Sequence, residues 1–113
     1  KGKAFDTFGP IGPYIVTKDE IKDVQNLNLE MKLNDKVMQK GNSQDMIFGV
    51  THLVSYLSYF MTLKPGDIIT TGTPPGVGMG RKPQIFLKDG DEMTLSINSL
   101  GEQKQKVISS KAV

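Results

Sequence analysis

The sequence predicts a mainly β fold with one main helix, and three stretches of the chain lead to this class. Apolar and polar side chains alternate over residues 26–34, at the two-residue period of a strand that buries one face. The same alternation returns over residues 92–98. Residues 50–61 instead place apolar side chains at the three- and four-residue spacing of an amphipathic helix. Strands therefore dominate the prediction.

The chain has 113 residues, the size of one small domain, and we expect residues 1–113 to form one unit. Its 14 basic and 12 acidic residues give a formal charge of +2, which is too small to indicate a nucleic-acid or membrane partner. The sequence has no cysteine, which excludes disulfides and thiol chemistry and fits a cytoplasmic location, or a mitochondrial one in a eukaryote. No apolar run approaches the roughly 20 residues that cross a bilayer, so we expect a soluble protein.

The N-terminal segment is predicted to follow a rigid, non-helical path. Gly9-Pro10 and Gly12-Pro13 interrupt it, because each proline fixes its own φ and pushes the preceding residue toward extended backbone. Residues 14–17 then predict a short strand, and residues 18–23 a polar turn or one helical turn. Because the first residues already belong to a patterned segment and no initiator methionine precedes them, we expect the chain to be part of a longer protein.

A hairpin and a helix are predicted in the middle of the chain. Residues 27–33 form the first long strand, and the turn formers Asn34 and Asp35 send residues 37–39 back antiparallel to it. The helical spacing extends over Val50–Met61, and Pro65-Gly66 ends this segment. This is the one convincing helix in the sequence.

The C-terminal half is predicted to contain two strands, a loop and a final hairpin. Residues 67–71 predict a buried strand that runs into the tight loop Gly72–Gly78, and residues 84–87 predict a short strand. Residues 92–98 and 103–108 are expected to pair as a final hairpin.

The Gly72–Gly78 loop is the first candidate site. A backbone rich in glycine and proline, placed directly after a buried strand, lets a ligand approach closely on a rigid path. It is not a phosphate-binding loop, since no Gly-Lys-Ser/Thr sequence and no helix follow it. An arbitrary loop of this composition more often serves only to reverse the chain.

Lys3 and Thr7 form the second candidate site. Residues four apart in an extended segment point to the same face, so an ammonium group and a hydroxyl could converge on one ligand. An ammonium group placed there would stabilise a developing enolate or carboxylate. Such a pair also arises often by chance, because most lysines are simply solvated.

Other polar side chains give no complete catalytic site. His52 lies on the predicted helix with no serine or carboxylate fixed beside it, so it indicates a partly exposed histidine and not a catalytic triad. The acidic residues lie mostly at turns, and no Glu-x-Glu pair with a third carboxylate is present to bind a hard cation.

Taken together, several motifs in chain order resemble the C-terminal region of the fumarylacetoacetate hydrolase family. The resemblance extends from Lys3 to Val107 and is strongest in the subgroup described as 2-hydroxyhepta-2,4-diene-1,7-dioate isomerases, ureidoglycolate lyases or fumarylacetoacetate hydrolase domain-containing proteins. The motifs are KAFDTFGP at residues 3–10, QKGNSQDMIF at 39–48, YLS at 56–58, LKPGDII at 63–69 and TGTPPGVG at 71–78.

The resemblance implies a mixed β-roll or β-clip-like catalytic domain, of which this chain is the incomplete C-terminal part. Members of the family usually form homodimers and bind a divalent Mg²⁺, with Mn²⁺ or Ca²⁺ as alternatives. They act on small β-dicarbonyl or 2-oxo acids as hydrolases, lyases or isomerases, through an enolate that the metal stabilises. A small keto acid is therefore the expected partner, with no role for nucleic acid or membrane.

The resemblance also implies roles for four residues. Lys3 matches the active-site lysine of the family, and Thr7 matches a threonine near the metal. Thr73 matches the threonine that meets a substrate carboxylate or carbonyl, and Gly72 would let the substrate come close. These roles require the Lys3 amine and the Thr73 hydroxyl to lie side by side.

The family's metal-binding carboxylates lie upstream of the matched lysine, so we expect the isolated chain to be inactive. Ala4 also departs from the family, since many members have serine at this position. Two alternatives remain open. A non-catalytic β module could bind a small ligand through the Gly72–Gly78 loop. A module for single-stranded nucleic acid would need an aromatic platform, and the sequence offers three tyrosines, five phenylalanines and no tryptophan.

Overall fold

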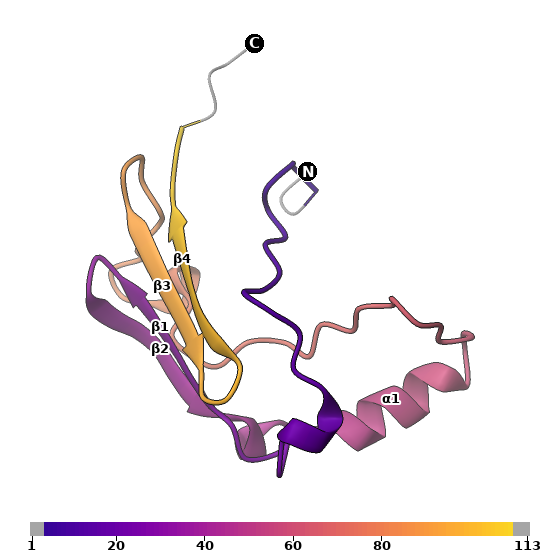
Figure 1. Cartoon of the computed structure of the whole chain (residues 1–113). Helices are drawn as coiled ribbons and strands as arrows, with labels where there is room; N and C mark the ends of the chain where they lie inside the picture. Colours follow the sequence, from indigo (N-terminus) through magenta and orange to yellow (C-terminus); the bar gives the residue numbers. More distant parts are fainter. Residues whose placement is uncertain (1–3, 110–113) are drawn as a thin grey trace.

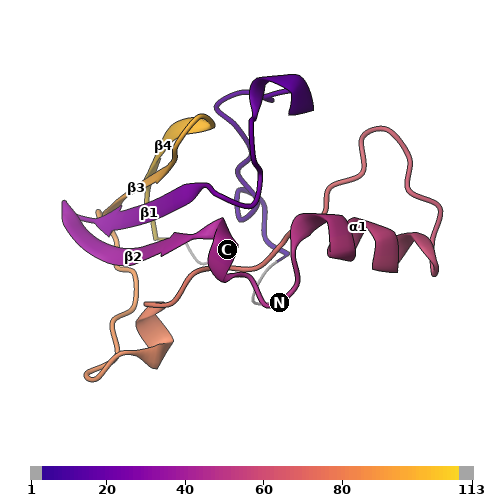
Figure 2. The same cartoon turned by 90° about the horizontal axis from the view of Figure 1, so that it is seen from below.

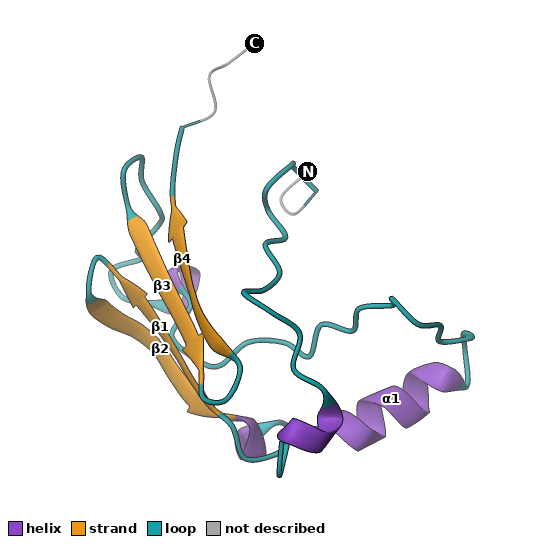
Figure 3. Cartoon of the chain, viewed as in Figure 1, coloured by secondary structure: helices purple, strands orange, loops and turns teal. Residues whose placement is uncertain are grey.

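The computed structural model describes residues 4–109, which form a four-stranded antiparallel sheet and one α-helix (Figures 1 and 3). The strands follow the spatial order β2-β1-β3-β4. The predicted class, mainly β with one main helix, is confirmed. The elements are β1 (Asn28–Leu33), β2 (Lys36–Asn42), α1 (Val50–Ser58), β3 (Glu92–Ile97) and β4 (Gly101–Lys106), with short 3-10 turns at Lys18–Glu20, Ser43–Asp45 and Gly78–Gly80.

The β1–β2 hairpin forms where the alternating pattern predicts it. Asn34 and Asp35 both have positive φ, 48° and 65°, as a two-residue hairpin turn requires. Asparagine and aspartate tolerate this left-handed conformation better than other residues with a side chain, which explains why they occupy the turn. Leu33 and Lys36 close the ladder on either side of it.

A β-bulge in β2 determines where its side chains point. The register shifts between Met31, which pairs with Gln39, and Lys32, which pairs with Val37. Met38 therefore has no paired residue on β1, as expected for the extra residue of a bulge. Its side chain is 6% exposed, and it is the one apolar side chain in the described part of the chain that is fully buried.

The β3–β4 hairpin confirms the predicted pairing, although β4 ends at Lys106 and not at residue 108. Gly101 begins β4 with φ of +89°, and a Cβ there would lie 2.8 Å from the Tyr14 hydroxyl. The N-terminal segment thus lies close to the start of the edge strand β4 at this glycine. Gln103 also donates a side-chain hydrogen bond to the Gly12 carbonyl.

The centre of the sheet joins elements far apart in sequence, because β1 pairs with β3. A polar corner closes one end of this pair. The Asn34 amide donates to Asp91 Oδ1 at 2.8 Å, and the backbone N–H of Glu92 donates to Asn34 Oδ1 at 2.9 Å. The hydrogen bond from Asn34 lowers the pKa of Asp91 from its ordinary value, and the backbone N–H and charge of Lys88 act in the same direction.

Three predicted strands were wrong, namely residues 14–17, 67–71 and 84–87. They contribute no strand to the sheet of the described residues. A strand requires a neighbouring strand to hydrogen-bond, and composition alone does not supply one. The helical turn expected after residue 17 is present as Lys18–Glu20, and α1 ends at Ser58, three residues before the predicted end.

The described unit is open, with α1 projecting away from the sheet in both views (Figures 1 and 2). No side chain of α1 is fully buried. The chain exposes 9661 Å², whereas a compact folded chain of its mass would expose about 6100 Å². Its radius of gyration is 15.9 Å, against about 13 Å for a compact domain of this length. Much apolar surface is therefore left for other protein to cover.

Within residues 4–109, no helix has the length and apolar character needed to cross a membrane.

Candidate functional site

The Gly72–Gly78 loop packs against β2, which lies at the edge of the sheet. Two glycines allow this contact. Gly76 has φ of +107°, and a Cβ there would lie 2.2 Å from the Met38 carbonyl oxygen. A Cβ on Gly41 would lie 2.8 Å from Pro74 Cβ. Both distances are shorter than a carbon atom tolerates, so loop and strand are in direct backbone contact.

Arg81 fastens the loop to the bulge of β2. Its Nε donates to the Gly76 carbonyl at 3.0 Å, and its Nη2 donates to the Met38 carbonyl. Because Met38 is the extra residue of the bulge, it has no partner on β1. A guanidinium group has donors in a rigid fork, which suits it to bridge two carbonyls.

Gln39 makes the third link between strand and loop. Its Nε2 donates to Thr73 Oγ1 at 2.8 Å and to the Pro74 carbonyl at 2.7 Å. Thr73 is exposed, whereas Gln39 is half-buried. The hydroxyl predicted to meet a ligand is thus anchored from the sheet on one side and open to solvent on the other.

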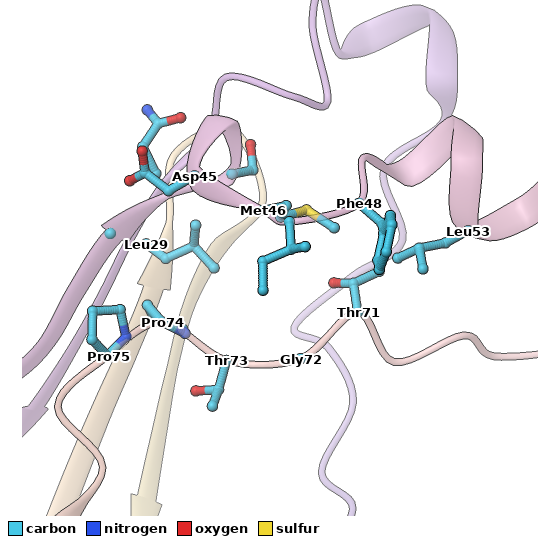
Figure 4. A pocket seen from close by; sticks show the side chains of 14 residues that line it. Leu29, Asp45, Met46, Phe48, Leu53, Thr71, Gly72, Thr73, Pro74 and Pro75 are labelled. Atoms are coloured by element: carbon cyan, nitrogen blue, oxygen red, sulfur yellow. The ribbon is translucent and has the colours of Figure 1, made fainter. Parts of the chain in front are cut away.

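A pocket of about 390 Å³ opens beside the loop. Its walls are residues 71–75, 41–43 and 45–48, Leu29 of β1 and Leu53 of α1, so that sheet, helix and loop all contribute (Figure 4). Gly72 and Thr73 both line it. Figure 4 shows the Thr71 side chain pointing toward Phe48, while the Thr73 side chain points away from the pocket. The loop therefore presents an apolar pocket on one face and the Thr73 hydroxyl on the other.

Of the two N-terminal candidates, Lys3 and Thr7, the structure describes only Thr7. Lys3 lies outside the described residues, so its placement beside Thr73 stays a prediction. Thr7 is exposed and has a positive φ of 70°, and the backbone N–H of Phe8 donates to the Phe5 carbonyl across a turn at this point. The expectation of an extended segment at Thr7 was therefore wrong, because a turn breaks the alternation of side chains on which it relied.

The described residues do not form a metal site by themselves. Between residues 4 and 109, no three histidine or acidic side chains come together. A hard divalent cation needs about six oxygen ligands, and one threonine hydroxyl does not supply them. The carboxylates for a metal near Thr7 would have to come from outside the described part of the chain.

His52 lies between two aromatic side chains, Phe48 just before α1 and Tyr56 on it. Its ring stacks on Phe48 with centroids 4.9 Å apart and on Tyr56 at 6.1 Å. The sequence predicted a partly exposed helix histidine, and His52 is an exposed residue of α1.

The sequence did not predict the roles of two residues at the loop, Arg81 and Gln39. Gln39 belongs to a motif of the family resemblance, which gave its position but no function. Arg81 had no signal, since one of its two acceptors is the carbonyl of Met38, the bulge residue, and the sequence did not predict the bulge.

Residues 1–108 match the sequence model described as Fumarylacetoacetate (FAA) hydrolase C-terminal. The chain belongs to the fumarylacetoacetate hydrolase family. A curated relative from Burkholderia cenocepacia (strain HI2424), known by a general hydrolase name, is 58% identical over 107 residues. These residues are 94% of this chain and 38% of that relative, so the chain spans well under half the length of the relatives it matches.

Two solved structures share the fold. The fumarylacetoacetate hydrolase of Exiguobacterium antarcticum is 39% identical with a TM-score of 0.93, over 96% of this chain and 39% of that chain. The maleylpyruvate hydrolase of Sphingobium sp. SYK-6, solved in complex with manganese(II) and pyruvate, is 38% identical with a TM-score of 0.87. That match covers 96% of this chain and 38% of that chain. The fold and family predicted from the sequence are confirmed.

Proposed function

We propose that the whole protein containing this chain is a divalent-metal-dependent enzyme that acts on small β-dicarbonyl or 2-oxo acids through an enolate. The observation that carries the proposal is the match over 96% of this chain to a hydrolase solved with manganese(II) and pyruvate. Pyruvate is itself a 2-oxo acid. Hydrolysis is the favoured reaction, because the curated relative and both solved structures have hydrolase names. Lyase and isomerase reactions are the alternatives within the same chemistry.

In this proposal the Gly72–Gly78 loop binds one end of the substrate. Gly72 has φ of +99° and a Cβ there would meet no atom within 4 Å, so its backbone faces open space. Thr73 adds a hydroxyl beside this space and donates to a carboxylate or carbonyl oxygen of the substrate. Lys3 stabilises the negative charge that develops as the enolate forms.

Mg²⁺ is the proposed metal, with Mn²⁺ or Ca²⁺ as alternatives. When bound, it would polarise the substrate carbonyl as a Lewis acid. Thr7 lies near it in this proposal, while carboxylates outside the described residues provide the ligands. The isolated chain is therefore inactive.

The whole protein is proposed to be a cytoplasmic homodimer. The large apolar surface supports this assembly, since a second subunit would cover part of it. The absence of cysteine supports a reducing compartment.

A second candidate function is favoured by the pocket. Its walls include Leu29, Leu53 and Phe48, and an apolar cavity of about 390 Å³ is large enough for a small ligand. A non-catalytic module using the Gly72–Gly78 loop would bind such a ligand without metal. Binding that persists after chelation, with no turnover in any condition, would favour this alternative.

The test uses the full-length protein with Mg²⁺ or Mn²⁺. Oxaloacetate, acylpyruvates and ureidoglycolate are supplied as substrates, and turnover of at least one is expected. Chelation with EDTA should abolish that turnover, and Lys3→Ala should reduce it by about 100-fold or more, because an oxyanion-stabilising donor contributes this much. Lys18→Ala is the matched control, since Lys18 lies on an exposed 3-10 turn. A Lys3→Ala variant with the wild-type rate contradicts the role given to Lys3.

A further inference from the structure

The two hydrogen-bond partners of the Gln39 side-chain amide determine its orientation. Its terminal group faces Thr73 Oγ1 at 2.8 Å and the Pro74 carbonyl oxygen at 2.7 Å. A carbonyl oxygen can only accept a hydrogen bond, so the group facing it must be the NH₂ end of the amide. The two hydrogens of that NH₂ then serve the two acceptors, one each.

This arrangement determines what the Thr73 hydroxyl can do. A hydroxyl has one proton to donate and two lone pairs to accept with. One lone pair takes the hydrogen bond from Gln39, and the NH₂ group cannot accept the hydroxyl proton in return. The proton of Thr73 is therefore left for another acceptor, on the side of the residue that is exposed.

We propose that Gln39 is a positioning residue that makes Thr73 a hydrogen-bond donor, so that the loop selects ligands through an acceptor-only group such as a carboxylate. This inference rests on the proposed function and extends it to a residue outside the loop. Gln39 acts through Thr73 and touches no substrate atom itself.

The loop does not depend on Gln39 alone for its attachment to the sheet. Arg81 donates to the carbonyls of Gly76 and Met38, and the Gly76 backbone lies directly against β2. Replacing Gln39 also removes its hydrogen bond to the Pro74 carbonyl, but the Arg81 and Gly76 contacts should hold the loop in place while the hydrogen bonding of Thr73 changes. This separation makes the proposal testable by substitution.

Gln39→Glu reverses the polarity of the contact. A carboxylate only accepts, so it takes the Thr73 proton and withdraws the donor from the ligand. We expect the manganese-loaded full-length variant to bind pyruvate about tenfold or more weakly than wild type in isothermal titration calorimetry. The KM for a substrate should rise with little change in kcat, as expected when uniform binding is lost. Gln39→Leu leaves the hydroxyl free to rotate and should have a smaller effect.

Two controls separate this role from simpler explanations. Gln84→Glu adds the same charge to a residue whose Nε2 donates to the Met79 carbonyl at 3.0 Å and not to Thr73, and it should bind pyruvate as wild type does. Gln39→Glu combined with Thr73→Val tests whether the effect passes through the hydroxyl. Coupling predicts that the double variant binds no more weakly than Thr73→Val alone.

Some outcomes would overturn the proposal. If Gln39→Glu weakens pyruvate binding equally in the wild-type and Thr73→Val backgrounds, it acts by charge repulsion and not through the hydroxyl. If Gln39→Glu binds pyruvate as tightly as the wild-type protein, and the wild-type protein turns over a substrate, the inference is wrong and the proposed function is unaffected. A wild-type protein that neither binds pyruvate nor turns over any oxo acid overturns both.

Discussion

Gly76→Ala tests whether the loop is held against the sheet by direct backbone contact. The added methyl carbon would lie 2.2 Å from the Met38 carbonyl oxygen, about 1 Å closer than van der Waals contact permits. The loop would have to move away from β2 by roughly this amount. Arg81 then could not reach both of its carbonyl acceptors, which lie on the loop and on the strand.

The expected loss has two parts. A residue with a side chain at the φ of +107° found for Gly76 costs about 1–2 kcal/mol. Losing one hydrogen bond to a charged donor costs about 1.5–3 kcal/mol more. The sum is about 4 kcal/mol, and with an m-value of about 3 kcal/mol/M it lowers the urea midpoint by about 1.3 M.

Two glycines of the same chain provide matched controls in a urea titration of the full-length protein. Gly66 has φ of +97° and open space around it, so Gly66→Ala isolates the conformational cost and should lower the midpoint by about 0.5 M. Gly78 has an ordinary φ, but a Cβ there would lie 1.8 Å from the Ile85 carbonyl oxygen. Gly78→Ala therefore measures the cost of a steric clash without the cost of a positive φ. Equal midpoints for the Gly76 and Gly66 variants would refute the packing of the loop on β2.

Two further substitutions test the supports of the sheet and the loop. Arg81→Lys keeps the charge but replaces the forked guanidinium with a compact ammonium group, so one of the two carbonyl contacts is lost. The urea midpoint should fall by about 0.5–1 M. An unchanged midpoint contradicts the bridge between loop and strand. Asp91 has a lowered folded pKa, so its carboxylate stabilises the fold above the unfolded pKa near about 4, and this contribution is lost as pH falls through the lower folded value. Asp91→Asn should therefore be less stable than wild type at pH 7, with a difference in urea midpoint that shrinks below about pH 4; a difference that is constant with pH contradicts the assignment.

Both hairpins could be predicted because their information is local. Alternation fixes which face of a strand is buried, and a two-residue turn fixes the register on each side of it. Asn34 and Asp35 supply that turn between β1 and β2, and their positive φ values are those of the expected hairpin. The pairing of β1 with β3 had no comparable signal, since 58 residues separate the end of β1 at Leu33 from the start of β3 at Glu92.

The wrong strands share one physical cause. Residues 67–71 are rich in β-branched side chains, and this composition favours extended backbone. Extended backbone becomes a strand only beside another strand, and within residues 4–109 none pairs with it. Ile68 is 67% exposed there, although the sequence suggested a buried position. The apolar pattern correctly indicated a surface that other protein must cover. The prediction that a strand of this chain covers it was wrong.

The candidate site, too, could be predicted only in part from the sequence. The composition of the Gly72–Gly78 loop predicted close backbone approach, and the structure shows that approach toward β2 at Gly76. What glycine spacing could not predict is the partner, because a bulge at Met38 shifts the side chains of the strand by one residue. That shift is the reason Gln39, and not a neighbour, contacts Thr73.

The open shape of the unit and the order at its loop have different origins, and this difference supports placing the site at the loop. The 9661 Å² of exposed surface reflects segments such as α1, whose apolar side chains lack covering protein. The loop instead meets β2 through contacts within the chain, from Gln39, Arg81 and the backbone of Gly76. Covering α1 with further protein would bury apolar area without altering those contacts. The Thr73 hydroxyl should therefore keep its donor orientation in the assembled enzyme.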